Sequence, residues 1–217
     1  MAYTVTNILA ELTAHGFEDI DAAQLLYFIN DAYYEFCSAP YPFLERTVAS
    51  TLTAGNASIP IIDADSHTVS KILAISNDTQ QYALEPTRLQ RLTKNFSGQL
   101  TNTGAPVYYY EINDAWFHYP VNTAGDSLTV RYLIMPKELG STDTPVVPIA
   151  HRRVITNGAL YRAYMMNDDV DIAQYFKKEV LDRTARIQED LYSQQYDRPD
   201  YVVDTSDEYN YDDRYTY

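Results

Sequence analysis

The hydrophobic positions near the start of the chain follow a helical period. Residues 4–38 predict two helices separated by Gly16, and the second repeats apolar residues every three or four positions. We expect Thr6 to cap the first helix, and Asp21 with Gln24 resembles a capping box at the start of the second. A proline pair then ends the second helix, because proline cannot continue it.

The middle of the chain, residues 45–135, changes to a period of two. The run SLTVRYLIM places alternate side chains on opposite faces of a strand, and KILAIS reads as another strand. We expect a hairpin around Gly55-Asn56 that joins RTVASTL to ASIPI, and a two-residue turn at Asn113-Asp114. EPTRLQRLTKN predicts a short surface helix. The region therefore predicts a small antiparallel sheet or sandwich.

Helical spacing returns after a linker at residues 136–146. Pro148 suits the first turn of a helix, and Gly158 with the alanines that follow it would let another helix approach closely. A longer helix at about residues 170–193 carries an apolar stripe on one side and charged residues on the others.

These patterns predict an α+β fold in which an antiparallel β domain is inserted into a helical bundle. The bundle combines residues 4–38 and 147–193 as about four helices, and the inserted β-rich domain spans residues 45–135. The linker is residues 136–146, and residues 194–217 form an extended C-terminal tail.

The composition restricts the classes of partner. A net charge of −14 on 217 residues repels phosphate, so DNA is expected to pass without specific binding. No stretch approaches 18 apolar residues, so we expect no membrane partner. The 21 tyrosines favour protein–protein contacts, because tyrosine combines a large flat surface with a polar tip. Cys37 has no cysteine partner and is expected to be a packed side chain.

Candidate chemistry is sparse, and we expect no enzyme, no catalytic residue, no cofactor and no metal. The chain lacks the common nucleophile, zinc and phosphate-loop motifs. Asp63, Asp65 and His67 could hold a cation on an extended segment, but a polar loop is the favoured interpretation. Trp116 and its aromatic neighbours could form a ligand platform, yet strand aromatics more often pack in a core.

Three stretches resemble a known family. They are PVYYYEINDAWFHYPVNTAGDSLTVRYLIMPKEL, TDTPVVPIAHRRVITNGALYRAYMMNDD and DIAQYFKKEVLDRTARIQEDL, and the step YPFLER into the first predicted strand is also similar. Their arrangement resembles the head-to-tail adaptor, or head-completion (connector), proteins of tailed bacteriophages. The resemblance covers roughly residues 5–195.

The resemblance implies a structural role in the virion without catalysis. Members of the family form a ring, usually of twelve copies, beneath the portal protein at the capsid vertex. The helices form the ring, the β part faces the next neck or tail protein, and the ring extends the DNA channel. The resemblance thus implies a protein of the head–tail interface that is assembled in the host cytoplasm and attaches the tail.

A ring subunit needs two lateral faces, because one side of each copy meets the opposite side of its neighbour. Tyrosines on the outer helix surfaces suit such faces. The candidate inter-subunit residues are Tyr161, Tyr164, Tyr175 and Tyr192, and Tyr27 and Tyr34 lie on other outer helix positions.

The C-terminal tail alternates acids with tyrosines and contains no Leu, Ile, Met or Ala after residue 202. Such a composition is typical of a solvated terminus in the isolated chain. The resemblance implies a second role, in which the tail docks on the portal. The candidate docking residues are Tyr196, Tyr201, Val202, Val203, Tyr209, Tyr211, Arg214, Tyr215 and Tyr217.

Other functions stay open on the sequence. A tail terminator or a tail-tube partner would be another structural piece of the same particle. An acidic DNA mimic that inhibits a nucleic-acid enzyme is disfavoured, because the densest acids lie in the tail and not on a rigid surface. A carbohydrate-binding module would depend on Trp116.

Overall fold

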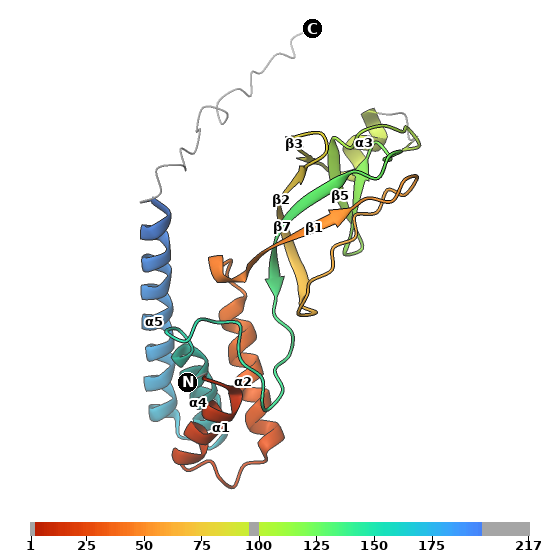
Figure 1. Ribbon diagram of the computed structural model, residues 1–217. Helices are drawn as coiled ribbons and strands as arrows, with labels where there is room; N and C mark the ends of the chain where they lie inside the picture. Colours follow the sequence, from red (N-terminus) through yellow and green to blue (C-terminus); the bar gives the residue numbers. More distant parts are fainter. Residues whose placement is uncertain (1–2, 96–99, 197–217) are drawn as a thin grey trace.

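The computed structural model describes residues 3–95 and 100–196 of the chain. Helices from both ends of the chain pack side by side, and the strands form a separate lobe at one end of them (Figure 1). The helices of this helical part are α1 (Val5–Ala14), α2 (Ala22–Cys37), α4 (Arg153–Met166) and α5 (Val170–Tyr196). The β part contains β1 (Glu45–Thr51), β2 (Thr68–Asn77), β3 (Tyr82–Ala83), β4 (Glu85–Pro86), α3 (Leu89–Asn95), β5 (Tyr108–Ile112), β6 (Ala115–Tyr119) and β7 (Ser127–Met135), and a short 3₁₀ turn (Pro42–Leu44) precedes it.

The first two helices form where they were expected, with one corrected cap. Thr4, not Thr6, is the N-cap of α1, and its backbone N–H donates to Asn7 Oδ1 at 2.9 Å. The hydroxyl of Thr6 instead donates to the carbonyl of Ser141, so it ties α1 to the linker. Asp21 caps α2 as predicted.

The start of α4 also differs from the prediction. The helix begins at Arg153, and residues 149–152 form turns, so Pro148 precedes the helix. The cause lies in the buried guanidinium of Arg152, which donates to the carbonyl oxygens of Val147 (2.7 Å), Pro145 (3.1 Å) and Tyr3 (2.5 Å). These bonds hold the end of the linker in a non-helical path against the chain before α1.

The small residues of α4 do allow a close helix contact, and the neighbour is α2. A Cβ placed on Gly158 would lie 2.8 Å from the Cβ of Ala32. The other long contact of α4 is with α5, whose apolar stripe packs on the opposite side of α4. The four helices therefore form the predicted bundle with α4 between α2 and α5.

The main sheet has the order β1-β7-β2-β3, and all its pairs are antiparallel. The predicted face of β7 is confirmed, because Leu128, Val130, Tyr132 and Ile134 are all buried. The predicted hairpin around Gly55 is wrong. β1 pairs with β7, while the Gly55 N–H donates to the carbonyl of Asn122, and Ser58 bridges to Phe117.

The second sheet has the order β4-β5-β6, and the predicted two-residue turn joins β5 to β6. Asn113 and Asp114 have φ angles of 49° and 59°, the left-handed values that such a turn requires. The helix α3 covers this sheet, and Leu92 packs with Tyr110 and Tyr119 in a small separate cluster.

The helical and β parts share one continuous cluster of buried side chains. Asn30 of α2 reinforces their junction, because its amide both donates to and accepts from the backbone of Leu139 (3.0 and 2.8 Å). The α+β class is confirmed. The division into domains stays a prediction, and tail residues 197–217 lie outside the described residues.

Candidate protein-interaction surfaces

Exposed apolar side chains gather where α4 passes into α5. We call Met165, Met166, Val170, Ile172 and Tyr175 the junction patch. Asp168 adopts a left-handed φ of 59° inside this turn and redirects the chain from one helix to the next. Tyr175 is 60% exposed, and it adjoins other exposed apolar residues instead of standing alone. The patch suits contact with another protein.

A groove runs between α2, α4 and α5 on another side of the bundle. We call it the α2–α5 groove, and it has a volume of about 240 Å³. Its walls include Phe36 and Val180, and Leu181 stands at its edge with 60% exposure. α5 therefore borders an apolar surface on two sides.

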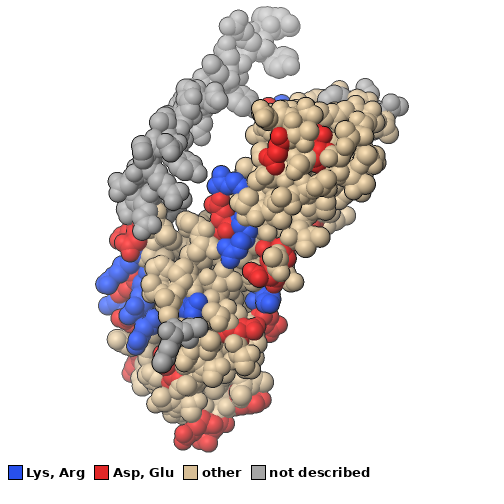
Figure 2. All heavy atoms as spheres, in the orientation of Figure 1, with Lys and Arg blue, Asp and Glu red and all other residues tan. Residues whose placement is uncertain are grey.

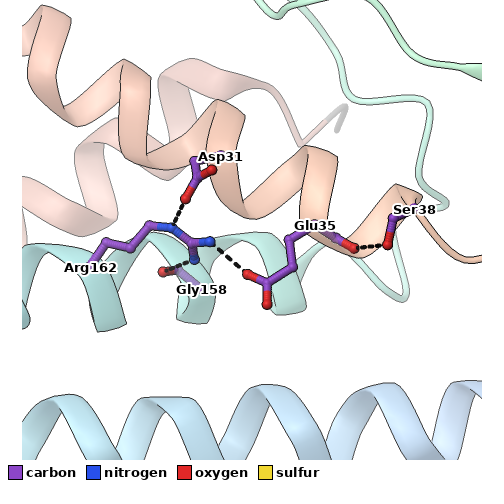
Figure 3. Close-up of polar contacts among 5 residues, drawn as sticks. All are labelled: Asp31, Glu35, Ser38, Gly158 and Arg162. Atoms are coloured by element: carbon purple, nitrogen blue, oxygen red, sulfur yellow. Dashed lines mark hydrogen bonds and ion pairs between the residues drawn. The ribbon is translucent and has the colours of Figure 1, made fainter.

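Arg162 is one of the polar residues that line the α2–α5 groove. Figure 3 shows its polar contacts with α2 and with its own helix. Its Nε donates to Asp31, its Nη2 donates to Glu35 at 2.6 Å, and its Nη1 donates to the carbonyl of Gly158 at 3.0 Å. Burial disfavours the charged guanidinium, but the bonds to Glu35 and Asp31 outweigh burial and raise the pKa of Arg162. This cluster fastens α2 to α4 beside their closest approach.

The Arg162 cluster was missed at the sequence level. A signal does exist, because two carboxylates four residues apart lie on the same face of a helix. The basic partner lies 131 residues from Asp31, and spacing within the sequence does not identify it.

The candidate inter-subunit tyrosines fall in different environments. Tyr175 is exposed in the junction patch, and Tyr161 lies under the ammonium of Lys177, 5.7 Å from its ring centre. Tyr164 stacks on Phe176 within the same chain, with ring centres 5.6 Å apart and an interplanar angle of 8°. The side chain of Tyr192 lies outside the described residues, and so does all of the docking tail beyond Tyr196, the last residue of α5.

Asp63, Asp65 and His67 do converge, with ligand atoms within 4.8 Å of one another. The carboxylate of Asp63 accepts bonds from the Tyr132 hydroxyl (2.9 Å) and from two backbone N–H groups. Burial opposes ionisation of Asp63, but these bonds outweigh it and lower its pKa. His67 Nδ1 accepts the Lys137 N–H at 3.0 Å. The cluster ties the loop before β2 to the linker.

The aromatic residues of β6 divide between surface and core. Trp116 packs half-buried against the main core and lines a broad hollow of about 780 Å³ together with Tyr109 and Ile72. Phe117 stacks on Tyr110 with ring centres 5.7 Å apart. Tyr119 is buried. The predicted core role is confirmed for Tyr119.

The cysteine is confirmed as a packed residue. Cys37 is buried at the end of α2, and burial raises the pKa of its thiol to about 12. A thiol with this pKa is almost entirely protonated at neutral pH, and the thiolate is the reactive form.

Charged side chains are unevenly distributed over the view in Figure 2. Basic and acidic atoms mix along α5, acidic atoms gather at the lower end of the helical part, and much of the β part is uncharged. Among residues 3–95 and 100–196, no helix combines the length and apolar character needed to cross a membrane.

A search of curated proteins finds no match. A family model described as the SU10 adaptor protein matches residues 3–216, nearly the whole chain. The chain therefore belongs to the SU10 adaptor protein family, a family of structural adaptor proteins of bacteriophages.

Proposed function

We propose that this chain forms an adaptor ring beneath the portal of a tailed bacteriophage. Membership of the adaptor family carries this proposal, since it implies a non-enzymatic virion component at the head–tail junction that contacts other head and tail proteins. The ring extends the DNA channel, and its outer surface accepts the next neck or tail protein. The family resemblance suggests twelve copies.

The shape of the helical part supports ring formation. A closed ring needs two different lateral faces that fit each other. The junction patch supplies exposed Ile172 and Tyr175, and the α2–α5 groove offers a concave apolar surface with Leu181 at its edge. We assign these two surfaces to the opposite sides of the inter-subunit contact, which adds Ile172 and Leu181 to the tyrosines expected from the sequence.

The net charge of −14 supports the channel role. An acidic lining repels the phosphate backbone, so a duplex slides through the ring and is not retained.

The tail supplies the portal contact in this proposal. Its tyrosines and acids would seat in pockets and beside basic residues of the portal, and Val202 with Val203 could add a strand to a portal sheet. The tail is therefore assigned to attachment, and the helices to ring closure.

Two variants test these assignments separately. The purified chain is mixed with portal-containing capsids, and bound copies are counted by imaging and native mass spectrometry. Deleting residues 200–217 should weaken attachment and leave the circular dichroism spectrum of the helices intact. Tyr175→Glu should leave single copies able to bind the capsids but prevent a closed ring, because the substitution would bury a carboxylate in the inter-subunit contact.

Ile62→Glu is the matched control for Tyr175→Glu, since Ile62 is 78% exposed and lies in the β part. Wild-type decoration by the truncated chain would refute the tail assignment, and closed rings of Tyr175→Glu would refute the lateral assignment. A closed ring of another copy number on a tail tube would favour a tail terminator or tail-tube partner.

A further inference from the structure

Three arginines surround a hollow between the start of α4 and the second half of α5. We call it the arginine hollow, and its lining includes Arg153, Arg183 and Arg186 around an apolar floor of Val154 and Ile187. The side chains of Arg153 and Arg186 are exposed. Among the described residues, no acidic side chain lines this hollow. It is thus a basic site on a strongly acidic chain.

The hydrogen-bonding capacity of this hollow is incompletely used within the described part of the chain. Among the described residues, Arg183 pairs with Glu179, the next turn of α5 towards its start, with Nε 3.4 Å from Glu179 Oε2. This ion pair does not have hydrogen-bond geometry, so the buried Arg183 Nε makes no hydrogen bond among the described residues. A guanidinium in this position favours a carboxylate ligand, because charge-assisted hydrogen bonds are about twice as strong as neutral ones.

The chain carries a complementary segment close by. Residues 204–213, DTSDEYNYDD, contain five acids, two tyrosines and no basic residue. Their acids can bond the arginines, while Tyr209 and Tyr211 can stack on a guanidinium. The segment therefore matches the hollow in charge.

The segment can reach the hollow from its own α5. Arg186 lies ten residues before the end of α5 at Tyr196, which is about 15 Å along a helix. Residues 197–203 span at most about 23 Å when extended, so they are long enough to return the chain along α5. No second copy of the chain is needed.

We propose that residues 204–213 bind the arginine hollow of their own subunit before assembly. This inference does not depend on a portal contact. If the tail also docks on the portal, as proposed above, the portal must then compete with the hollow for the same segment, and attachment is restrained until a portal is present.

A peptide of residues 200–217 provides the direct test, added to the chain that lacks these residues. Tethering raises the effective concentration of the segment to about 1 mM, so a dissociation constant at or below that value suffices for occupancy within one chain. Fluorescence anisotropy in low salt should show such binding. The variant Arg183→Gln/Arg186→Gln should bind about tenfold more weakly.

Lys177→Gln/Lys178→Gln is the matched control, because it removes the same charge from the same helix at positions that do not line the hollow. It should bind like the parent. No binding at about 1 mM peptide, or equal loss in both variants, would overturn the proposal.

Chymotrypsin cleavage of the full-length chain tests the contact within one subunit. The tail tyrosines should be cut more slowly in the parent chain than in Arg183→Gln/Arg186→Gln, and this protection should not depend on protein concentration. Protection that increases with concentration would assign the hollow to the tail of a second copy and overturn the proposal. Equal cleavage of parent and variant would also overturn it.

Discussion

The contact between Gly158 and Ala32 leads to a prediction opposite to the usual effect of removing a helical glycine. Replacing a helix-interior glycine with alanine ordinarily stabilises a protein by about 1 kcal/mol, because alanine restricts the unfolded chain. Here the new Cβ would lie 2.8 Å from the Cβ of Ala32 on α2. That atom is bonded directly to the backbone, so no side-chain rotation can move it away. Carbon atoms pack at about 3.5–4.0 Å, so the helices must separate by about 1 Å.

The magnitude follows from two opposing terms. Overpacking of this kind costs about 1–3 kcal/mol, against a gain of about 1 kcal/mol from helix propensity. Separation of α2 from α4 would also stretch the bonds of Arg162 to Asp31 and Glu35. We therefore expect Gly158→Ala to lower the free energy of unfolding by about 1 kcal/mol.

A double-mutant cycle isolates the contact. Ala32→Gly alone should destabilise the protein by about 1 kcal/mol through lost propensity, yet combined with Gly158→Ala it removes the clash. The pair should be more stable than the sum of the singles by about 1–3 kcal/mol. Urea unfolding followed by circular dichroism measures each value. Ala185→Gly, at an exposed site of α5, reports propensity without packing.

Two results would refute the reasoning. If Gly158→Ala stabilises the protein, α2 and α4 do not approach as closely as the structure indicates. If the two substitutions are additive, any destabilisation by Gly158→Ala has a source other than Ala32.

Two further predictions concern the β part. Burial lowers the pKa of His118 below its ordinary 6.5, although its contacts with the carbonyls of Pro120 and Asn56 act in the other direction. The unfolded chain therefore takes up a proton first as the pH falls below 6.5, and stability should decrease from that pH downwards. His118→Gln should flatten this decrease in thermal midpoints measured from pH 7.5 to 5, and an unchanged slope would contradict the assignment. Asp114→Gly should stabilise the protein by about 0.5 kcal/mol, because glycine tolerates the φ of 59°. Asp114→Val should lower the free energy of unfolding, measured in urea, by about 1–2 kcal/mol. A valine variant as stable as the parent would argue against the left-handed turn.

Local patterns predicted the elements of the fold more successfully than their boundaries. The stripe of α2 and the alternation of β7 depend on neighbouring residues, and both were confirmed. The turn at Asn113-Asp114 was confirmed for the same reason, since few residue pairs tolerate two left-handed conformations. The predicted start of α4 was wrong, because Arg152 binds three carbonyl groups and keeps the residues before it outside the helix.

The candidate surfaces were predicted less completely. Tyrosine content indicated protein contacts, but it could not distinguish exposed Tyr175 from Tyr164, which stacks on Phe176 of the same chain. The two side chains have the same chemistry and lie on neighbouring helices, so their exposure depends on how α4 and α5 pack. The arginine hollow was not predicted, because it joins Arg153 to Arg183 and Arg186 across two helices.

The sequence by itself determined the helical ends of this chain, its β-rich middle and its family, because periodicity, turn residues and composition act over short distances. Tertiary structure decided which strands pair and which charges meet. β1 could have paired with the residues just after it, but it lies beside β7, where Val48 and Val130 are opposed and the buried face of β7 joins the core. Burial of such side chains depends on the whole packed chain, and no local pattern records it.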